Sequence, residues 1–207
     1  EPLHAGNEGS GSIWYSFKAP TDGLLSVSTI NAGFDTVLGM YMGDRVDRLS
    51  LVTFNDEDPA LKEMEDNPGL SRIDQALEGG MEVYIALDGF AGARGAVSLL
   101  SEFEAGPIHR LSVSANNGGK MVSALTQPFN DEDGRYTLFA HNGLARLEVR
   151  PDGGNVFEGW QGSLNSMDNP LDLVVTENIK VMANFGPISL SENFETGDLG
   201  HLQWKTV

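Results

Sequence analysis

The 207-residue chain contains no cysteine, which excludes disulfide bonds, thiol nucleophiles and cysteine-ligated zinc sites. This absence leaves the compartment open, because exported proteins can also be free of cysteine. Long apolar runs are lacking too, since no stretch approaches the roughly 18 to 20 residues of a membrane-spanning helix. The chain opens on Glu-Pro with no charged-then-apolar leader, so we interpret it as an internal piece of a longer protein or as one whose leader was removed.

Basic residues are scarce, because 13 Lys and Arg stand against 30 Asp and Glu, a net charge of −17. Residues 1–104 hold 18 acidic and 6 basic side chains, a net −12, and the remainder carries −5. Nucleic acids and anionic membranes are bound through clustered Lys and Arg, so we expect no nucleic-acid partner and no membrane insertion. An acidic surface attracts cations, and it also keeps an extracellular protein soluble.

Known catalytic motifs are lacking as well. The sequence has no Gly-x-Ser-x-Gly, no His-Glu-x-x-His and no glycine-rich phosphate loop, and nothing singles out two acids for glycoside cleavage. The histidines fall in predicted loops or strand edges and are interpreted as surface side chains: His4, His109, His141 and His201. We therefore do not expect this chain to be an enzyme.

A strand-forming pattern dominates what is present. Residues 33–43 are apolar on both alternating faces, with Val37 and Tyr41 on one face and Leu38 and Met40 on the other. A strand of this kind must be covered on both sides, so it predicts the middle of a sheet inside a sandwich.

Period-two hydrophobicity extends over most of the chain. In the first half it predicts a strand whose inner face is Ile13, Tyr15 and Phe17, and a short helix between Asp58 and Asn67. Further strands are predicted at 25–29, 50–54, 70–77, 81–88, 95–101, 111–113, 121–125, 136–140, 145–149, 156–160 and 179–185. Residues 131–134 are interpreted as a turn.

The predicted fold class is all-β. It consists of a jelly-roll-like N-terminal β-sandwich over residues 1–104, a small mainly-β module over 108–185, and an incomplete C-terminal segment over 186–207. A polar break from Glu102 to Pro107 separates the two modules. The last segment, which contains Phe194 and Trp204, is interpreted as a linker and the start of a further domain.

Two family resemblances are carried by ordered motifs. Through SIWYSFKAP at 12–20, FDTVL at 34–38 and YIALDG at 84–89, residues 1–101 resemble the bacterial pre-peptidase C-terminal (PPC) domain, a β-sandwich of secreted proteins. Through LEVRP at 147–151, FEGWQG at 157–162 and VMANF at 181–185, residues 108–185 resemble the divergent B-repeat of internalin and other bacterial surface proteins. Together these resemblances imply an extracellular or cell-surface region of a large multidomain bacterial protein.

Oxygen ligands cluster around an acidic loop and predict a calcium site, since Ca²⁺ takes six to eight hard oxygens. The resemblance adds an N-terminal acid, because some PPC domains bind calcium there, although Ser10, Ser12 and Ile13 stand where further aspartates would be expected. The alternative is solvated loop charge with one carboxylate paired to Arg72. The candidate metal ligands are Glu1, Asp35, Asn55, Asp56, Asp58 and Asp88.

Trp14 is the candidate ligand-binding residue, because it alternates with Ile13 and Tyr15 and would be exposed, where its ring can stack on a sugar. Trp160 is the corresponding candidate in the second module. The alternative for both is core packing, the usual role of aromatic residues in strands.

These observations leave three functions. The first is a non-catalytic adhesion or targeting region that binds an extracellular polymer, a glycan or a protein surface and is stiffened by calcium. The second is a structural stalk or filament module that binds neighbouring copies or domains by strand addition. The third is an accessory role beside a secreted hydrolase.

Overall fold

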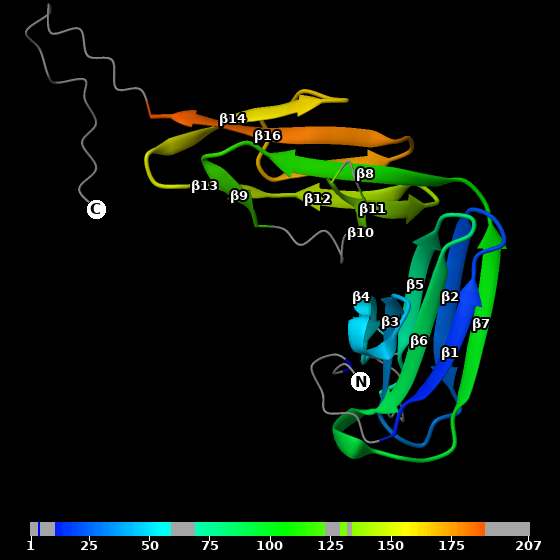
Figure 1. The fold of residues 1–207 in the computed structure, drawn as a ribbon. Helices are drawn as coiled ribbons and strands as arrows, with labels where there is room; N and C mark the ends of the chain where they lie inside the picture. Colours follow the sequence, from blue (N-terminus) through cyan, green and yellow to red (C-terminus); the bar gives the residue numbers. More distant parts are fainter. Residues whose placement is uncertain (1–3, 5–10, 59–68, 123–128, 132–133, 189–207) are drawn as a thin grey trace, which may run out of the picture.

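The computed structural model describes residues 4, 11–58, 69–122, 129–131 and 134–188, which form two β modules that meet at a bend (Figure 1). The fold is all-β, as predicted, with two short 3-10 turns, η1 (Val46–Arg48) and η2 (Phe90–Gly92), among the described strands. No helix in the described part of the chain has the length and apolar character needed to cross a bilayer. Most of the predicted helix, residues 59–67, lies outside the described residues.

The first module packs a four-stranded sheet on a three-stranded one. The larger sheet has the order β1 (Ile13–Lys18), β6 (Glu82–Gly89), β3 (Thr36–Met42) and β4 (Ser50–Asn55). The smaller has the order β5 (Arg72–Leu77), β2 (Gly23–Ile30) and β7 (Ser98–Ala105). All neighbours are antiparallel. Because β7 runs to Ala105, the expected polar break from Glu102 is strand, and only Gly106 and Pro107 connect the modules.

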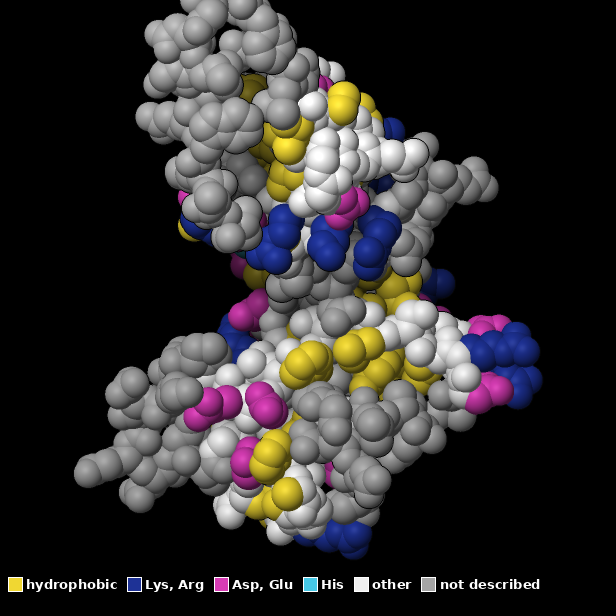
Figure 2. All heavy atoms as spheres, turned by 90° about the vertical axis from the view of Figure 1, so that its left-hand side faces the viewer, with side chains coloured by type: hydrophobic (Ala, Val, Ile, Leu, Met, Phe, Trp, Pro, Cys, Tyr) yellow, Lys and Arg dark blue, Asp and Glu magenta, His cyan; other side chains and the backbone are white. Residues whose placement is uncertain are grey.

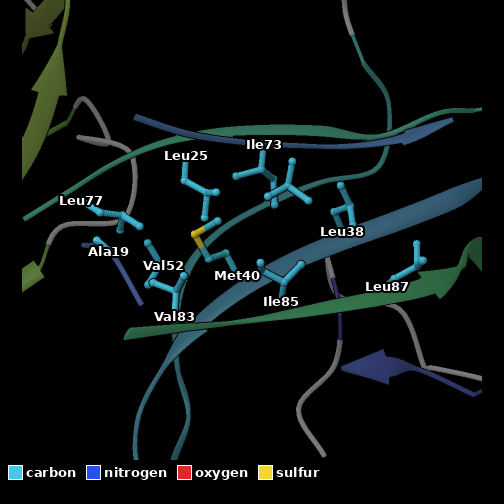
Figure 3. Packing of buried hydrophobic residues seen from close by; sticks show 11 residues of the cluster. Ala19, Leu25, Leu38, Met40, Val52, Ile73, Leu77, Val83, Ile85 and Leu87 are labelled. Atoms are coloured by element: carbon cyan, nitrogen blue, oxygen red, sulfur yellow. The ribbon is translucent and has the colours of Figure 1, made fainter. Parts of the chain in front are cut away.

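The core of this module lies between the two sheets (Figure 3). Strand β3 is the central contributor, as predicted, since it lies between β6 and β4 and is buried from Thr36 to Tyr41. The side chains that fill the core include Leu25, Val27, Leu38, Met40, Val52, Ile73, Leu77, Val83, Ile85 and Leu87. Burial of this apolar surface supplies the main stabilisation of the sandwich.

The predicted inner face of β1 is wrong for two of its three residues. Ile13 is 52% exposed and Tyr15 is 43% exposed, whereas Phe17 packs against Phe103 of β7 with ring centroids 5.3 Å apart. Strand β1 is the edge of its sheet, and the opposite sheet covers its inner face at Phe17 but not at Ile13 and Tyr15.

The second module contains a five-stranded sheet ordered β10 (Phe129–Asp131), β11 (Gly134–Ala140), β8 (Ile108–Ala115), β16 (Ile179–Pro187) and β14 (Asn155–Gly162). Strands β16 and β8 are parallel, and the other pairs are antiparallel. Two short antiparallel pairs complete the module: β12 (Gly143–Leu147) with β15 (Leu171–Val175), and β13 (Val149–Pro151) with β9 (Gly119–Met121). The interpreted turn falls at the β10–β11 hairpin, where Asp131 pairs with Gly134 and residues 132–133 lie outside the described chain.

The alternation predicted for this module is confirmed. Ala145, Leu147 and Val149 are buried, and so are the inward residues of β16 from Ile179 to Phe185. Trp160 belongs to the same core, because it is 1% exposed and its Nε1 donates a hydrogen bond to the Asp168 carbonyl at 3.0 Å. Its interpretation as a sugar-stacking platform is therefore wrong, and core packing accounts for it.

Candidate functional site

The predicted metal ligands come from the end of the first sandwich that lies away from the second module. Register sets this position, because Gly23 of β2 pairs with Ala105 beside the connection, whereas Val37 pairs with Asp88 and Leu38 pairs with Asn55 at the opposite end. We call the latter the distal end. Asp35 precedes β3 there, and its carbonyl accepts a hydrogen bond from the Phe90 amide at 3.0 Å.

The pKa of Asp35 is shifted by its surroundings at the distal end. Partial burial raises the pKa of its carboxyl, and the negative charges of Asp56 and then Glu57 raise it further. Its Oδ1 atom is buried and has no hydrogen-bond partner among the described residues. The structure therefore brings Asp35 and Asp56 close enough to repel each other.

The remaining predicted ligands have protein contacts instead. Asn55 Oδ1 accepts a hydrogen bond from the Arg72 amide at 3.0 Å, and Asp88 accepts hydrogen bonds from the Ser12 hydroxyl and the Gly89 amide. Asp58 is buried, and Glu1 lies outside the described residues. Across the described chain, no group of three or more acids or histidines is placed to hold a metal ion. Calcium binding stays a prediction.

His4 is not a surface side chain, contrary to its interpretation from the sequence, because it is only 1% exposed. Its Nδ1 lies 2.7 Å from the Tyr41 hydroxyl and its Nε2 lies 3.0 Å from Ser12 Oγ, while Ser12 Oγ donates to Asp88 at 3.1 Å. Since the Ser12 hydroxyl donates to Asp88, Ser12 Oγ accepts from His4 Nε2–H, and Nδ1 on the other side of the ring is hydrogen-bonded to the Tyr41 hydroxyl. His4 therefore covers the outer face of β3, which explains how that strand is buried on both sides.

The order of residues in this chain of hydrogen bonds differs from that of a catalytic triad. In a Ser-His-Asp triad the histidine lies between the serine and the acid, so that the acid orients the base. Here Ser12 lies between His4 and Asp88, and the acid contacts the hydroxyl. No base is oriented toward a free nucleophile by this arrangement.

Trp14 packs beside the same residues. Its ring centroid lies 5.4 Å from that of His4 and 5.4 Å from that of Tyr41, and the residue is half-buried. The expectation that it lies exposed is therefore wrong, because His4 packs against it on the outer face of the sheet. Ligand contact by Trp14 stays a prediction, and core packing accounts for the contacts observed.

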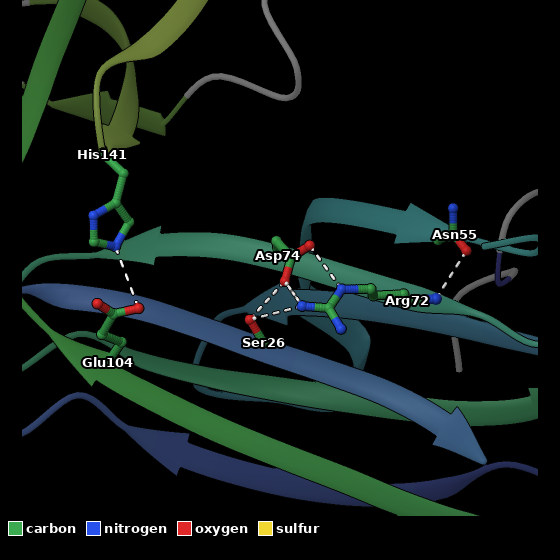
Figure 4. A network of polar contacts seen from close by, with 6 residues as sticks. All are labelled: Ser26, Asn55, Arg72, Asp74, Glu104 and His141. Atoms are coloured by element: carbon green, nitrogen blue, oxygen red, sulfur yellow. Dashed lines mark hydrogen bonds and ion pairs between the residues drawn. The ribbon is translucent and has the colours of Figure 1, made fainter. Parts of the chain in front are cut away.

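A polar network occupies the outer face of the smaller sheet (Figure 4). Arg72 donates to both Asp74 oxygens at 2.9 and 2.8 Å, and Ser26 donates to Asp74 at 2.6 Å. Burial alone would raise the pKa of Asp74, but the hydrogen bonds from Arg72 and Ser26 outweigh it and hold that pKa below its usual value. Arg72 thus pairs with Asp74 of its own strand rather than with a carboxylate of the acidic loop.

Sequence reasoning missed the seam between the modules. Strand β11 packs on β5, where Ala76, Tyr136 and Leu138 form a buried cluster. Arg110 donates to Glu78 at 2.8 Å and lies 3.7 Å above the Tyr136 ring. The signal available in the sequence was the apolar alternation through Tyr136, Leu138 and Ala140. Thr137, on the other face of the same strand, is also buried.

The cavities at these places are small. One of about 210 Å³ lies at the seam between Leu24, Ala76 and residues 137–140, and one of about 150 Å³ lies near Ile13, Phe34 and Arg94. Sites for drug-sized ligands usually enclose roughly 300 to 1,000 Å³. The surfaces that this part of the chain offers to partners are sheet faces and strand edges.

No family model, curated protein or solved structure matches this chain. The resemblances to the PPC domain and to the internalin B-repeat therefore stay interpretations of the sequence motifs.

Proposed function

We propose that this chain is a non-catalytic adhesion or targeting region of a secreted or cell-surface bacterial protein. It binds an extracellular polymer, a glycan or a protein surface, and it holds two β modules in one fixed relation. The observation that supports this proposal best is the seam. Only two residues connect the modules, and a buried apolar cluster and an ion pair lie at their seam. These contacts keep the surfaces of both modules at a constant angle.

The test measures retention of the purified chain on insoluble peptidoglycan, chitin and cellulose, with the supernatant assayed for released sugars. Retention on one polymer without release is expected. A matched pair of variants then locates the surface: Tyr15→Ala on the exposed edge of the first module, and Met167→Ala, which removes another exposed side chain from the second. Release of soluble product would contradict the non-catalytic assignment, and no retention on any polymer or on matrix proteins would contradict adhesion.

A second candidate is a structural stalk or filament module that binds neighbouring copies. The uncovered edge of the first sandwich favours it, because among the described strands β1 pairs only with β6 and β7 only with β2. Exposed Ile13 and Tyr15 line this edge, which makes it available for an added strand. Sedimentation velocity over a range of concentrations should show association, and a strict monomer would contradict this candidate.

A further inference from the structure

The second module exposes two cations on neighbouring strands. Lys120 of β9 and Arg150 of β13 lie directly opposite each other, both are exposed, and neither forms an ion pair with a described residue. Like charges in directly opposed positions destabilise a sheet. In a chain with a net charge of −17, such a pair is a local exception.

Apolar side chains continue the same surface. Leu144 and Val174 lie directly opposite each other in β12 and β15 and are 80% and 50% exposed. Between them and the cations, Arg146 forms a salt bridge with Asp172 at 2.8 Å, and the half-buried Glu148 lies between Arg146 and Arg150 along the chain. We call Lys120, Arg150, Leu144 and Val174 the cationic face. Lys and Arg side chains gather in a row on the second module, on its side toward the first (Figure 2).

The distal end of the first module has the complementary composition. Asp35 and Asp56 repel each other there, and the buried Asp35 Oδ1 has no hydrogen-bond partner in the described part of the chain. Phe54 is 43% exposed and lies two residues before Asp56. Phe90 is 38% exposed and directly follows β6, which ends beside Asp35. Both surfaces therefore combine like charges at close range with uncovered apolar side chains.

We propose that the cationic face of one copy of this chain receives the distal end of a second copy. Bringing Lys120 and Arg150 against Asp35 and Asp56 relieves two like-charge repulsions at once and covers apolar area on both sides. The inference rests on the filament candidate above and names its contact. Because the two surfaces lie on different modules, the contact is head-to-tail and propagates as an open chain unless the rotation closes a ring.

A second copy fits this face better than an anionic polysaccharide. A polyanion supplies charge for Lys120 and Arg150, but it leaves Leu144 and Val174 uncovered. The distal end supplies both carboxylates and aromatic side chains. Within one chain the distal end lies at the end of the first module opposite the connection to the second (Figure 1).

Two variants that each lose one surface test the contact. Lys120→Glu/Arg150→Glu reverses the charge of the cationic face. Asp35→Asn/Asp56→Lys removes the negative charge of the distal end. In sedimentation velocity at about 50 mM NaCl the wild-type chain should associate, with Kd weakening about tenfold or more at about 300 mM as salt screens the charges. Each variant alone should be monomeric. Their mixture should form a dimer that stops at one copy of each, because only one complementary pair of surfaces remains.

The matched control is Lys180→Glu/Arg135→Glu, which makes the same charge change on exposed residues elsewhere in the second module and should associate like the wild type. Association that survives in Lys120→Glu/Arg150→Glu would overturn the contact and leave the filament candidate to strand addition. A wild-type monomer at low salt would overturn both. Binding of a sulfated polysaccharide through Lys120 and Arg150 by a monomeric chain would assign the face to a polymer and overturn the inference.

Discussion

Asp35 is the residue at which charge opposes folding. Its pKa is raised in the folded chain, so the folded state binds a proton more tightly than the unfolded state, and ionisation at neutral pH costs stability. We predict that Asp35→Asn raises the unfolding temperature at pH 7, by less than about 1 kcal/mol in free energy because the side chain is only half-buried. The gain should shrink as the pH falls through the raised pKa. A variant less stable than the wild type at pH 7 would contradict this.

Calcium acts on the same residue if the predicted site forms. A cation between Asp35 and Asp56 offsets their repulsion, so millimolar Ca²⁺ should raise the unfolding temperature of the wild-type chain and a chelator should reverse the effect. Asp35→Asn/Asp56→Asn should respond less. Differential scanning calorimetry with Mg²⁺ as the control ion measures this. Equal curves with and without Ca²⁺ would remove calcium from the distal end.

Asp74 should respond to pH in the opposite direction. Its lowered pKa means that pairing with Arg72 and Ser26 contributes stability above the unfolded pKa, and this contribution is lost as the pH falls through the folded pKa. Asp74→Asn should therefore lower stability at pH 7, by at most about 1 kcal/mol because the pair is nearly half exposed, and should approach the wild type in acid. Urea unfolding at pH 7 and pH 3 tests it. A deficit that stays constant with pH would contradict the ionic contribution.

At the scale of elements, His4 covers the outer face of β3 at Tyr41. His4→Ala removes the hydrogen bonds to Tyr41 and Ser12 and exposes apolar area on the outer face of that strand. We expect a loss of about 1–3 kcal/mol in urea unfolding. His141→Ala is the control, because His141 is half exposed and its only described ion pair is with Glu104 at 3.5 Å. Equal stability of the two variants would show that the contacts of His4 do not stabilise the fold.

Strands with alternating apolar residues could be predicted from the sequence, but the contacts that other segments make with those strands could not. The burial of β3 and the inward face of Ala145, Leu147 and Val149 follow from alternation alone. The exposure of Ile13 and Tyr15 depends on where the opposite sheet covers β1, and the partial burial of Trp14 depends on its contact with His4. These are long-range contacts, for which local spacing carries no signal.

The same distinction holds for the candidate sites. The sequence identified the carboxylates of the distal end, because they are close along the chain or flank neighbouring strands. It did not identify Lys120 opposite Arg150, which are 30 positions apart and meet only through the pairing of β9 with β13. Nor did it reveal the seam, because Ala76 and Leu138 belong to different modules.

At the scale of the whole molecule, Leu138 determines whether the two modules behave as one body. Leu138→Ala removes the centre of the seam, where the side chain is 5% exposed, and should cost about 2–5 kcal/mol. We expect the single unfolding transition of the wild type to separate into two, because each module retains its own core while the coupling between them is lost. Small-angle scattering should show a larger maximum dimension as the bend opens.

Ile188→Ala provides the control for this change, since it removes as many carbon atoms from a side chain that is 51% exposed in the same module and lies outside the cationic face. Its stability should stay within about 0.5 kcal/mol of the wild type, with unchanged scattering. If Leu138→Ala also keeps one transition and the wild-type dimensions, then the Arg110–Glu78 pair and the Gly106–Pro107 connection fix the angle without the apolar cluster. Adding Glu78→Gln to Leu138→Ala separates these contributions, because the ion pair is then removed while the connection stays.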